Sequence, residues 1–428
     1  MKTVLLIAPY FPPRRRVGSL RPFKFAIHLK DLGWKPVILT LETAGEILTD
    51  HEKKLLDGVD IISVKAPFDR TVKPVKSSSS KRVNKKRLSL LDKFGDWIDK
   101  QIPTDSWMPL FHLKYRSILK DVKDHQPDLI WCTGDPWSGL WLGDKIARDL
   151  DLPLISDFRD PWTLANLNLR KRSRLSSSID KSIEKRVLSH SNHMVFTAES
   201  TKEKYQKTYE IEESGCSVIY NSFSEKLSLS AGDGKWGKEL SQDKLHLIFL
   251  GQFRRLSPAK IIIEAVDHFN RQNPALCEKL TVHSFGELED SDVLRIEELG
   301  LQSHFVQHEK VEPEKIKSVL NHADMLLLSS HIKRDLIVPA KLWDYIPSGK
   351  PILSVSTNPE IAKILNETHS GVQFHPKNLS EISDYLAESI LKKSKGELVS
   401  KVKDDEIRKY ESGHTTRQLV DIMNRISG

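Results

Sequence analysis

The chain has 428 residues, 39% of them hydrophobic and 29% charged, which is typical of a soluble globular protein with more than one domain. Its formal net charge is +8, and no apolar stretch approaches the ~20 residues that a transmembrane helix needs. The three cysteines, Cys132, Cys216 and Cys277, are far apart and form no CxxC pair, which argues against a disulfide framework or a zinc site. A protein of the reducing cytoplasm is therefore expected.

Apolar runs typical of strands alternate with helical patterns along the first half of the chain. This alternation predicts a parallel sheet covered by helices on both faces. The apolar run at the amino terminus is short and ends in prolines, so it is interpreted as a first strand and not as a signal peptide. Strands are expected at 4–8, 35–40, 58–64, 128–133, 154–157, 193–197 and 216–220, and helices at 21–32, 115–125, 137–150 and 176–191.

The same pattern restarts after a polar stretch rich in Ser, Gly, Asp and Lys. Strands are expected at 245–250, 280–285, 305–308, 325–329 and 352–355, and helices at 260–270, 361–365, 379–391 and 415–426. The fold class predicted is α/β, with two Rossmann-like doubly wound domains facing a cleft that is the expected ligand site. The domains are placed at 1–225 and 244–405, with a linker at 226–243 and a terminal segment at 406–428 that packs back on the first domain.

The positive charge is concentrated in one segment. Eight basic residues and no acidic residue lie between Arg70 and Leu91, and a stretch with helical apolar spacing that includes Trp97 follows. Basic residues beside an aromatic amphipathic stretch suit an anionic membrane surface. The alternative is a solvated loop followed by a helix that docks on its own domain. No recognised binding module accompanies the charge, so nucleic acid is not an expected partner.

Polar residues follow several strand ends in the first half. Gly18 lies in the loop between the first strand and a helix start, where backbone amides can receive an anion, although the loop lacks the GxGxxG pattern. The loop with Asp157, Arg159 and Asp160 offers two carboxylates that could polarise a hydroxyl group, or a network that only braces the loop. Asn221 follows the last strand, where it either approaches the cleft or shapes a turn.

The second half presents cations after its first strand. Gly251, Arg254 and Arg255 occupy the loop, and Lys260 opens the next helix. Guanidinium and ammonium groups beside a glycine suit a diphosphate, and they stabilise a leaving phosphate without a metal ion. None of the sixteen histidines forms a metal-binding spacing, so no metal site is expected.

The segment 337–351 is the most informative of the sequence. It places Lys341 and Asp344 three residues apart on a short helix between two buried strands, and Gly349 with Pro351 ends that helix. A cation and a carboxylate at the carboxyl edge of a parallel sheet suit the phosphates and ribose hydroxyls of a nucleotide. The alternative is a surface salt bridge on an ordinary crossover helix.

Taken together, the chain resembles bacterial GT-B glycosyltransferases of the family-4 type over most of its length. The carriers of the resemblance are the segments 8–13 with Gly18, 157–162, 251–260 and 339–351. The resemblance implies a retaining, metal-independent transfer of a sugar from a UDP- or GDP-linked donor, with no other cofactor. The implied acceptor is a hydroxyl group, expected on a lipid-linked or polysaccharide intermediate of envelope, capsule or O-antigen synthesis.

The resemblance also assigns roles to residues. Arg255 and Lys260 match the Arg–Lys pair that holds the diphosphate, and Asp344 matches the acidic residue that binds ribose. Lys341 with the preceding loop, including Pro339, would support phosphate or sugar. The Glu that often contacts the donor sugar is replaced here by Leu336, with Asp335 beside it.

The catalytic base cannot be carried over in the same way. Many relatives have a His in the loop where this chain has Asp160, so Asp160 is the first substitute and Asp157 the second. Two other functions remain open: a nucleotide-sugar epimerase on the same two-domain plan, and a sugar-nucleotide-binding protein without turnover. Consumption of a donor by the purified protein distinguishes them.

Overall fold

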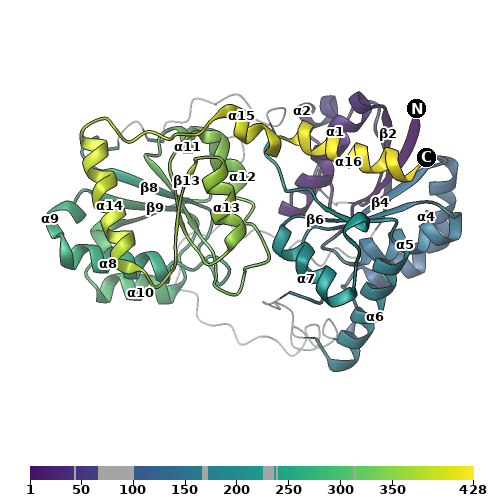
Figure 1. Cartoon of the computed structure of the whole chain (residues 1–428), viewed down its shortest axis with the longest axis horizontal. Coiled ribbons are helices and arrows are strands. Elements are labelled where there is room, and N and C mark those ends of the chain that lie inside the picture. The colour runs from purple at the N-terminus through teal and green to yellow at the C-terminus, as the bar shows by residue number, and fades with distance from the viewer. Residues whose placement is uncertain (43–44, 66–100, 166–171, 225–235, 238–239, 313–314) are drawn as a thin grey trace. The chain divides into compact units, whose positions relative to one another are not determined.

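The chain folds into two compact units. One comprises Met1–Tyr220 with Thr416–Gly428, and the other comprises Asn221–Thr415. Figure 1 shows the computed structural model, which describes residues 1–42, 45–65, 101–165, 172–224, 236–237, 240–312 and 315–428. The predicted basic segment, the amphipathic stretch around Trp97 and most of the predicted linker lie outside the described residues.

A seven-stranded parallel sheet forms the centre of the first unit, in the order β3-β2-β1-β4-β5-β6-β7. The order reverses between β1 and β4, which is the switch point where doubly wound proteins bind ligands. The strands are β1 (Lys2–Ile7), β2 (Trp34–Leu41), β3 (Asp60–Val64), β4 (Leu129–Gly134), β5 (Leu154–Phe158), β6 (His193–Phe196) and β7 (Cys216–Val218). The helices are α1 (Leu20–Leu29), α2 (Asp50–Leu55), α4 (Met108–Asp124), α5 (Ser138–Leu150), α6 (Arg174–His190) and α7 (Glu199–Tyr209).

The last helix of the chain returns to this first unit. Helix α16 (Ser412–Ile426) is the yellow helix beside α1 in Figure 1. The Lys2 ammonium group donates hydrogen bonds to the carbonyls of Ser427 and Gly428, and the Trp34 indole donates to Asn424. These contacts tie the start of β1 and β2 to the carboxyl end of the chain.

The second unit contains a six-stranded parallel sheet in the order β10-β9-β8-β11-β12-β13. Its switch point lies between β8 and β11. The strands are β8 (Leu245–Leu250), β9 (Leu280–Phe285), β10 (Phe305–His308), β11 (Met325–Ser329), β12 (Ile352–Val355) and β13 (Gly371–Phe374). The helices are α8 (Lys260–Gln272), α9 (Pro274–Cys277), α10 (Asp290–Glu298), α11 (Ile316–Asn321), α12 (Leu342–Tyr345), α13 (Pro359–Glu367), α14 (Leu379–Ser394) and α15 (Asp404–Ile407).

Burial explains why the strands read as apolar runs and why some elements escaped the sequence analysis. The central strands β1, β4, β8 and β11 are buried on both faces over most of their length, so most of their side chains are apolar without alternation. Helices α7 and α10 were not predicted because they bury only Thr201 with Tyr205 and only Ile296, respectively. Among the helices of the described residues, none combines the length and the apolar character needed to cross a bilayer.

Three histidines form a hydrogen-bonded row across β8, β9 and β10. The imidazole of His283 lies between those of His246 and His308, with ring nitrogens 2.9 Å apart on each side. The indole of Trp236 contacts the rings of His283 and His308 edge-on. Burial lowers the pKa of all three histidines, and that of His283 falls to about 3. The folded row is therefore neutral at pH 7.

We expect acid to destabilise the second unit through this row. In the unfolded chain a histidine has a pKa of 6.5, and in the folded row the pKa values are lower. The row's contribution to stability is therefore complete above pH 6.5 and is lost as the pH falls from 6.5 toward 3. Each excluded proton changes the free energy of unfolding by about 1.4 kcal/mol per pH unit. Urea unfolding at pH 7 and pH 4 should show the loss in the parent chain and a smaller loss in His283→Leu. The exposed His375→Gln serves as control; an equal pH slope in His283→Leu and the parent would contradict the assignment.

Candidate functional site

A buried hydrogen bond positions the candidate site at the carboxyl edge of the second sheet. The backbone amide of Leu250, the last residue of β8, donates to the hydroxyl of Tyr345 on α12 at 2.9 Å. The Tyr345 side chain has no exposed surface. The next residue, Gly251, has a φ of +89°, a left-handed conformation that favours glycine. Strand β8 and helix α12 are thus fixed to each other at the switch point of the sheet.

The ammonium group of Lys341 lies in this corner. It is 4.0 Å from the centre of the Phe249 ring, and a Cβ added to Gly251 would meet its Cε at 3.4 Å. Burial, together with the positive charges of Arg254 and Arg334 and against the opposing charge of Asp344, lowers the pKa of Lys341 to about 7. A cation held in a desolvated position beside two guanidinium groups is a site prepared for an anion.

The two predicted arginines lie on a tight turn after Gly251. Backbone hydrogen bonds in both directions between Arg254 and Ser257 close the turn, and Arg255 is at its exposed tip. The His331 amide donates to the Leu256 carbonyl at 3.1 Å, which attaches the turn to the loop after β11. The charge effect on Lys341 comes from Arg254. Both arginines are exposed, so they differ in their charge effect on Lys341 and not in burial class.

The other predicted donor-binding residues of this unit surround the corner. Asp344 is exposed on α12, Pro339 is buried just before that helix, and Asp335 is half-buried in the loop after β11. The amide of Asn358 donates to the carbonyls of Arg334 and Ile337 and so holds this loop in place.

One local detail differs from the sequence interpretation, and Lys260 opens its helix as predicted. Lys341 caps α12 at its amino end and does not lie within the helix, because the α-helix covers only Leu342–Tyr345 before a 3-10 turn that ends at Gly349. Lys260 begins α8 with 72% of its side chain exposed and pairs with Glu264 at 3.6 Å. Its ammonium group is therefore solvent-exposed and held by a surface ion pair.

In the first unit, Gly18 makes room for an arginine. A Cβ on Gly18 would lie 2.3 Å from Nη1 of Arg159, so any other residue would displace the guanidinium group. Nη2 of Arg159 donates to the carbonyl of Asp135 at 2.8 Å, and Nε pairs with Asp160 at 3.3 Å. Nη1 is buried and meets no hydrogen-bond acceptor within the described part of the chain. The loops after β1, β4 and β5 therefore converge on one guanidinium group with a donor to spare.

Asp157 takes the bracing role that the sequence left as an alternative. Its carboxylate is fully buried and accepts hydrogen bonds from Nε and Nη2 of Arg21 and from the hydroxyl of Thr133. Arg21 also donates to the carbonyl of Tyr220 at 3.0 Å. This geometry does not suit a catalytic base, because the carboxylate is enclosed and already satisfied. The partner of Asp157 is Arg21 and not the neighbouring Arg159.

Asp160 keeps an accessible carboxylate. Its side chain is 31% exposed, at the carboxyl edge of β5. Nearby, the rings of Trp137 and Trp162 stack with centres 5.5 Å apart and an angle of 5° between their planes. Asn221 is half-buried where the chain passes into the second unit.

Several residues that build these two edges were missed by sequence reasoning. Tyr345, Arg334 and Phe249 surround Lys341, but a tyrosine or phenylalanine in an apolar run looks like core. The group of three charged residues and one histidine at 331–335 was the available signal for Arg334. Among the described residues, no cluster of His, Cys, Asp or Glu has the arrangement of a metal site.

Family models match both units of the chain. The model of Glycosyltransferase Family 4 matches residues 23–225, and that of Glycosyl transferases group 1 matches residues 234–404. The chain belongs to the family-4-type glycosyltransferases. It is thus a glycosyltransferase, and the fold with two doubly wound parallel sheets is the GT-B fold.

Solved structures show the same architecture at low sequence identity. Sucrose-phosphate synthase from Thermosynechococcus elongatus has a TM-score of 0.66 at 11% identity, with 100% of this chain and 99% of that chain covered. The Anabaena protein HepE in complex with UDP and glucose has a TM-score of 0.63 at 13% identity, with 99% and 100% covered. The lipopolysaccharide outer core galactosyltransferase WaaB has a TM-score of 0.56 at 11% identity, with 99% of each chain covered. No curated protein sequence matches this glycosyltransferase significantly.

The lowered pKa of Lys341 predicts pH-dependent binding of a nucleoside diphosphate. An anion stabilises the charged ammonium, so binding should weaken as the pH rises above the free pKa of about 7. The expected loss is about tenfold per pH unit between pH 7 and pH 8.5. Calorimetric titration of UDP in buffers of different ionisation enthalpy should also detect proton uptake at pH 8. Lys341→Met should bind weakly without this pH dependence, whereas the exposed Lys279→Met should match the parent. A parent affinity that does not change with pH would refute the role of Lys341.

Proposed function

We propose that this glycosyltransferase transfers a sugar from a UDP- or GDP-linked donor to a hydroxyl acceptor with retention and without a metal ion. The observation that carries the proposal is the corner of the second unit, where the half-buried Lys341 lies beside the left-handed Gly251 and feels the charges of Arg254 and Arg334. Three cations and one nearby carboxylate, that of Asp344, leave an excess of positive charge for a diphosphate.

In this proposal the charges of the corner act when the glycosidic bond breaks. The leaving diphosphate gains negative charge in the transition state, and fixed cations in a poorly solvated position stabilise it more than they stabilise the bound donor. Arg255 and Lys260 are exposed beside the corner and can turn toward a ligand. Asp344 would accept hydrogen bonds from ribose, with Asp335 and Pro339 in the loop that borders the sugar. The UDP-bound state of HepE supports a nucleotide as the ligand.

The first unit would hold the acceptor. Asp160 is its accessible carboxylate and the candidate base, and Arg159 offers an unpaired Nη1 beside Gly18. The acceptor is proposed to be a lipid-linked or polysaccharide intermediate met at the inner face of the plasma membrane. The galactosyltransferase WaaB, which shares the fold, acts on a lipopolysaccharide outer core according to its name.

Donor binding tests the phosphate assignment. A thermal-shift screen of nucleotide sugars and nucleoside diphosphates identifies the donor, and calorimetry then gives the dissociation constants of the variants. Hydrogen bonds to charged groups contribute about 1.5–3 kcal/mol, so Arg254→Ala and Arg255→Ala should each weaken binding about 10- to 100-fold.

The matched control for these variants lies at the other end of α8. Arg271 is 69% exposed and pairs with Asp267, so Arg271→Ala removes a surface arginine without changing the corner. Its affinity should equal that of the parent. Unchanged affinity in Arg255→Ala would refute its assignment to the diphosphate, and unchanged affinity in both Arg254→Ala and Arg255→Ala would refute the proposed corner.

Turnover tests the reaction and the role of Asp160. The purified protein with the identified donor should release nucleotide only when a membrane extract supplies the acceptor. Release of nucleotide and free sugar without an acceptor would favour the epimerase, and binding without consumption would favour a non-catalytic protein. Asp160→Asn should lower kcat by about 10²- to 10⁴-fold with little change in the donor KM. The exposed Asp121→Asn is the control, and normal kcat in Asp160→Asn would eliminate Asp160 as the base.

A further inference from the structure

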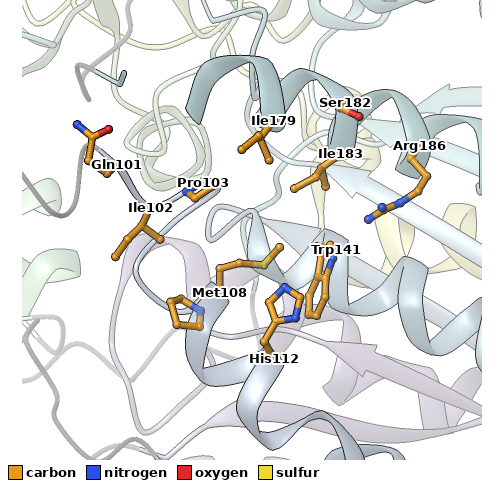
Figure 2. A pocket seen from close by; sticks show the side chains of 11 residues that line it. Gln101, Ile102, Pro103, Met108, His112, Trp141, Ile179, Ser182, Ile183 and Arg186 are labelled. Carbon is orange, nitrogen blue, oxygen red and sulfur yellow. The ribbon is translucent and has the colours of Figure 1, made fainter. Parts of the chain in front are cut away.

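An apolar groove opens on the first unit between helices α4, α5 and α6. Its volume is about 750 Å³, which lies within the range of small-molecule sites. Figure 2 shows Ile179, Ile183 and Arg186 of α6 along one side and Met108 with His112 of α4 along the other, with Trp141 of α5 between them. Ile102 is at one end of the groove and Arg186 at the other. None of the residues assigned to the donor or to the base lines it.

The lining is mostly apolar, with Gln101 and Ser182 as uncharged polar members and one cationic end. The His112 imidazole packs on the Trp141 indole with ring centres 4.2 Å apart. Burial, reinforced by the charge of Lys145, lowers the pKa of His112, which keeps this ring neutral at pH 7. Arg186 is the charged residue of the lining. A ligand that fills the groove must therefore be apolar along its length and anionic where it meets Arg186.

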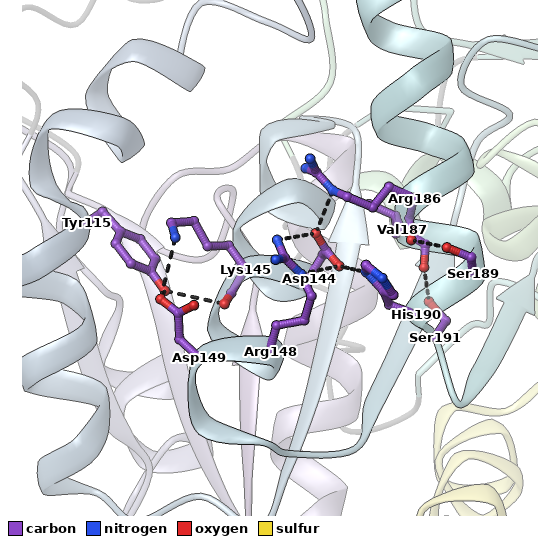
Figure 3. A network of polar contacts seen from close by, with 10 residues as sticks. All are labelled: Tyr115, Asp144, Lys145, Arg148, Asp149, Arg186, Val187, Ser189, His190 and Ser191. Atoms are coloured by element: carbon purple, nitrogen blue, oxygen red, sulfur yellow. Dashed lines mark hydrogen bonds and ion pairs between the residues drawn. The ribbon is translucent and has the colours of Figure 1, made fainter.

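A buried carboxylate fixes the guanidinium group at that end. Asp144 of α5 has no exposed surface and pairs with Nε of Arg186, with Arg148 and with Nδ1 of His190 (Figure 3). Although burial opposes it, the hydrogen bonds from Arg148 and His190 and the charge of Arg186 hold the pKa of Asp144 below its usual value. One carboxylate thus faces two guanidinium groups, and the cluster carries net positive charge.

Arg186 retains a hydrogen-bond donor that the cluster does not use. Its Nη2 is buried and meets no acceptor among the described residues. Figure 3 shows that Asp149, the next acidic residue along α5, is bonded to Tyr115 and Lys145 and is therefore occupied elsewhere. A buried N–H group without an acceptor is costly, and a phosphate oxygen would satisfy it.

The rim of the groove shows the same charge preference. On α6 the exposed charged residues are Arg174, Lys181 and Lys185, because the helix's two carboxylates, Asp180 and Glu184, are buried. The first ten residues of α4 contain Lys114 and Arg116 and no acidic residue. Leu113 and Leu175 add apolar side chains that are 79% and 72% exposed. Exposed apolar groups among cations fit the interface of an anionic bilayer.

We propose that this groove docks the first unit on an anionic membrane by taking up the phosphate-bearing end of one lipid, with the phosphate at Nη2 of Arg186 and the upper acyl chain against Trp141 and Ile179. The proposal rests on the membrane part of the proposed function and gives that part a location. Sugar transfer does not enter the test below, so failure of the docking site and failure of the glycosyltransferase assignment are distinguishable.

Flotation of the full chain with vesicles tests the site. Vesicles of phosphatidylcholine with phosphatidylglycerol should bind the parent, and vesicles of phosphatidylcholine alone should not. A cation near such a surface contributes about fivefold in affinity through its charge alone. Lys181→Gln, which removes one charge from the same helix outside the groove, should therefore lose about fivefold at most. Arg186→Gln should lose well over tenfold.

The apolar contact is tested separately. Ile179→Glu should abolish flotation, whereas Leu391→Glu on α14 should leave it unchanged. Phosphatidylcholine and phosphatidylglycerol with brominated acyl chains should quench tryptophan fluorescence in the parent and less in Trp141→Phe. Thermal unfolding confirms that each variant is folded.

Three outcomes would overturn the docking site. One is an equal loss in Arg186→Gln and Lys181→Gln, which would indicate a diffuse charge effect. Another is equal quenching in Trp141→Phe and the parent, which would place the lipid elsewhere. The last is undiminished flotation of both Arg186→Gln and Ile179→Glu, which would leave the groove with no part in membrane binding.

Discussion

The desolvated ammonium group of Lys341 is the constraint on which the donor corner depends. It lies over the Phe249 ring and beside Gly251, where the hydrogen bond from Leu250 to Tyr345 fixes α12 to the end of β8. The nearby arginines make the position more unfavourable for a charge, and a bound diphosphate would relieve this repulsion. A site of this kind is stabilised by its ligand, which is why binding, charge and proton uptake are coupled in it.

The first unit has a similar arrangement that is built from different residues. Its switch point also gathers loops around a cation with unused hydrogen-bonding capacity, here Arg159, and Gly18 leaves the space for its guanidinium group. The carboxylates divide the work by burial. Asp157 is enclosed by Arg21 and Thr133 and holds the loops together, whereas Asp160 pairs with Arg159 and remains partly exposed.

A local excess of cations over buried carboxylates also distinguishes the groove of the first unit. Asp144 is paired with more positive groups than it can neutralise. The excess positive charge lies at Arg186, at the end of the apolar groove. An excess of positive charge at a polar corner suits a nucleotide. The same excess at the end of an apolar groove suits a phospholipid. Part of the net charge of +8 thus lies at two surfaces, the polar corner of the second unit and the apolar groove of the first unit.

The sequence by itself determined the two doubly wound sheets, because strands buried on both faces must be continuous apolar runs and their loops must leave at one edge. It also determined the position of Gly251, Arg254, Lys341 and Asp344 at that edge, since each follows or adjoins such a run. Only the tertiary structure decided which side chains meet. That Arg21 pairs with Asp157 across 136 residues, that Arg159 fills the space beside Gly18, and that α4, α5 and α6 enclose a groove all depend on strand order and helix packing. Periodicity reports which face of an element is buried, but it carries no information about the partner on the other side of the contact.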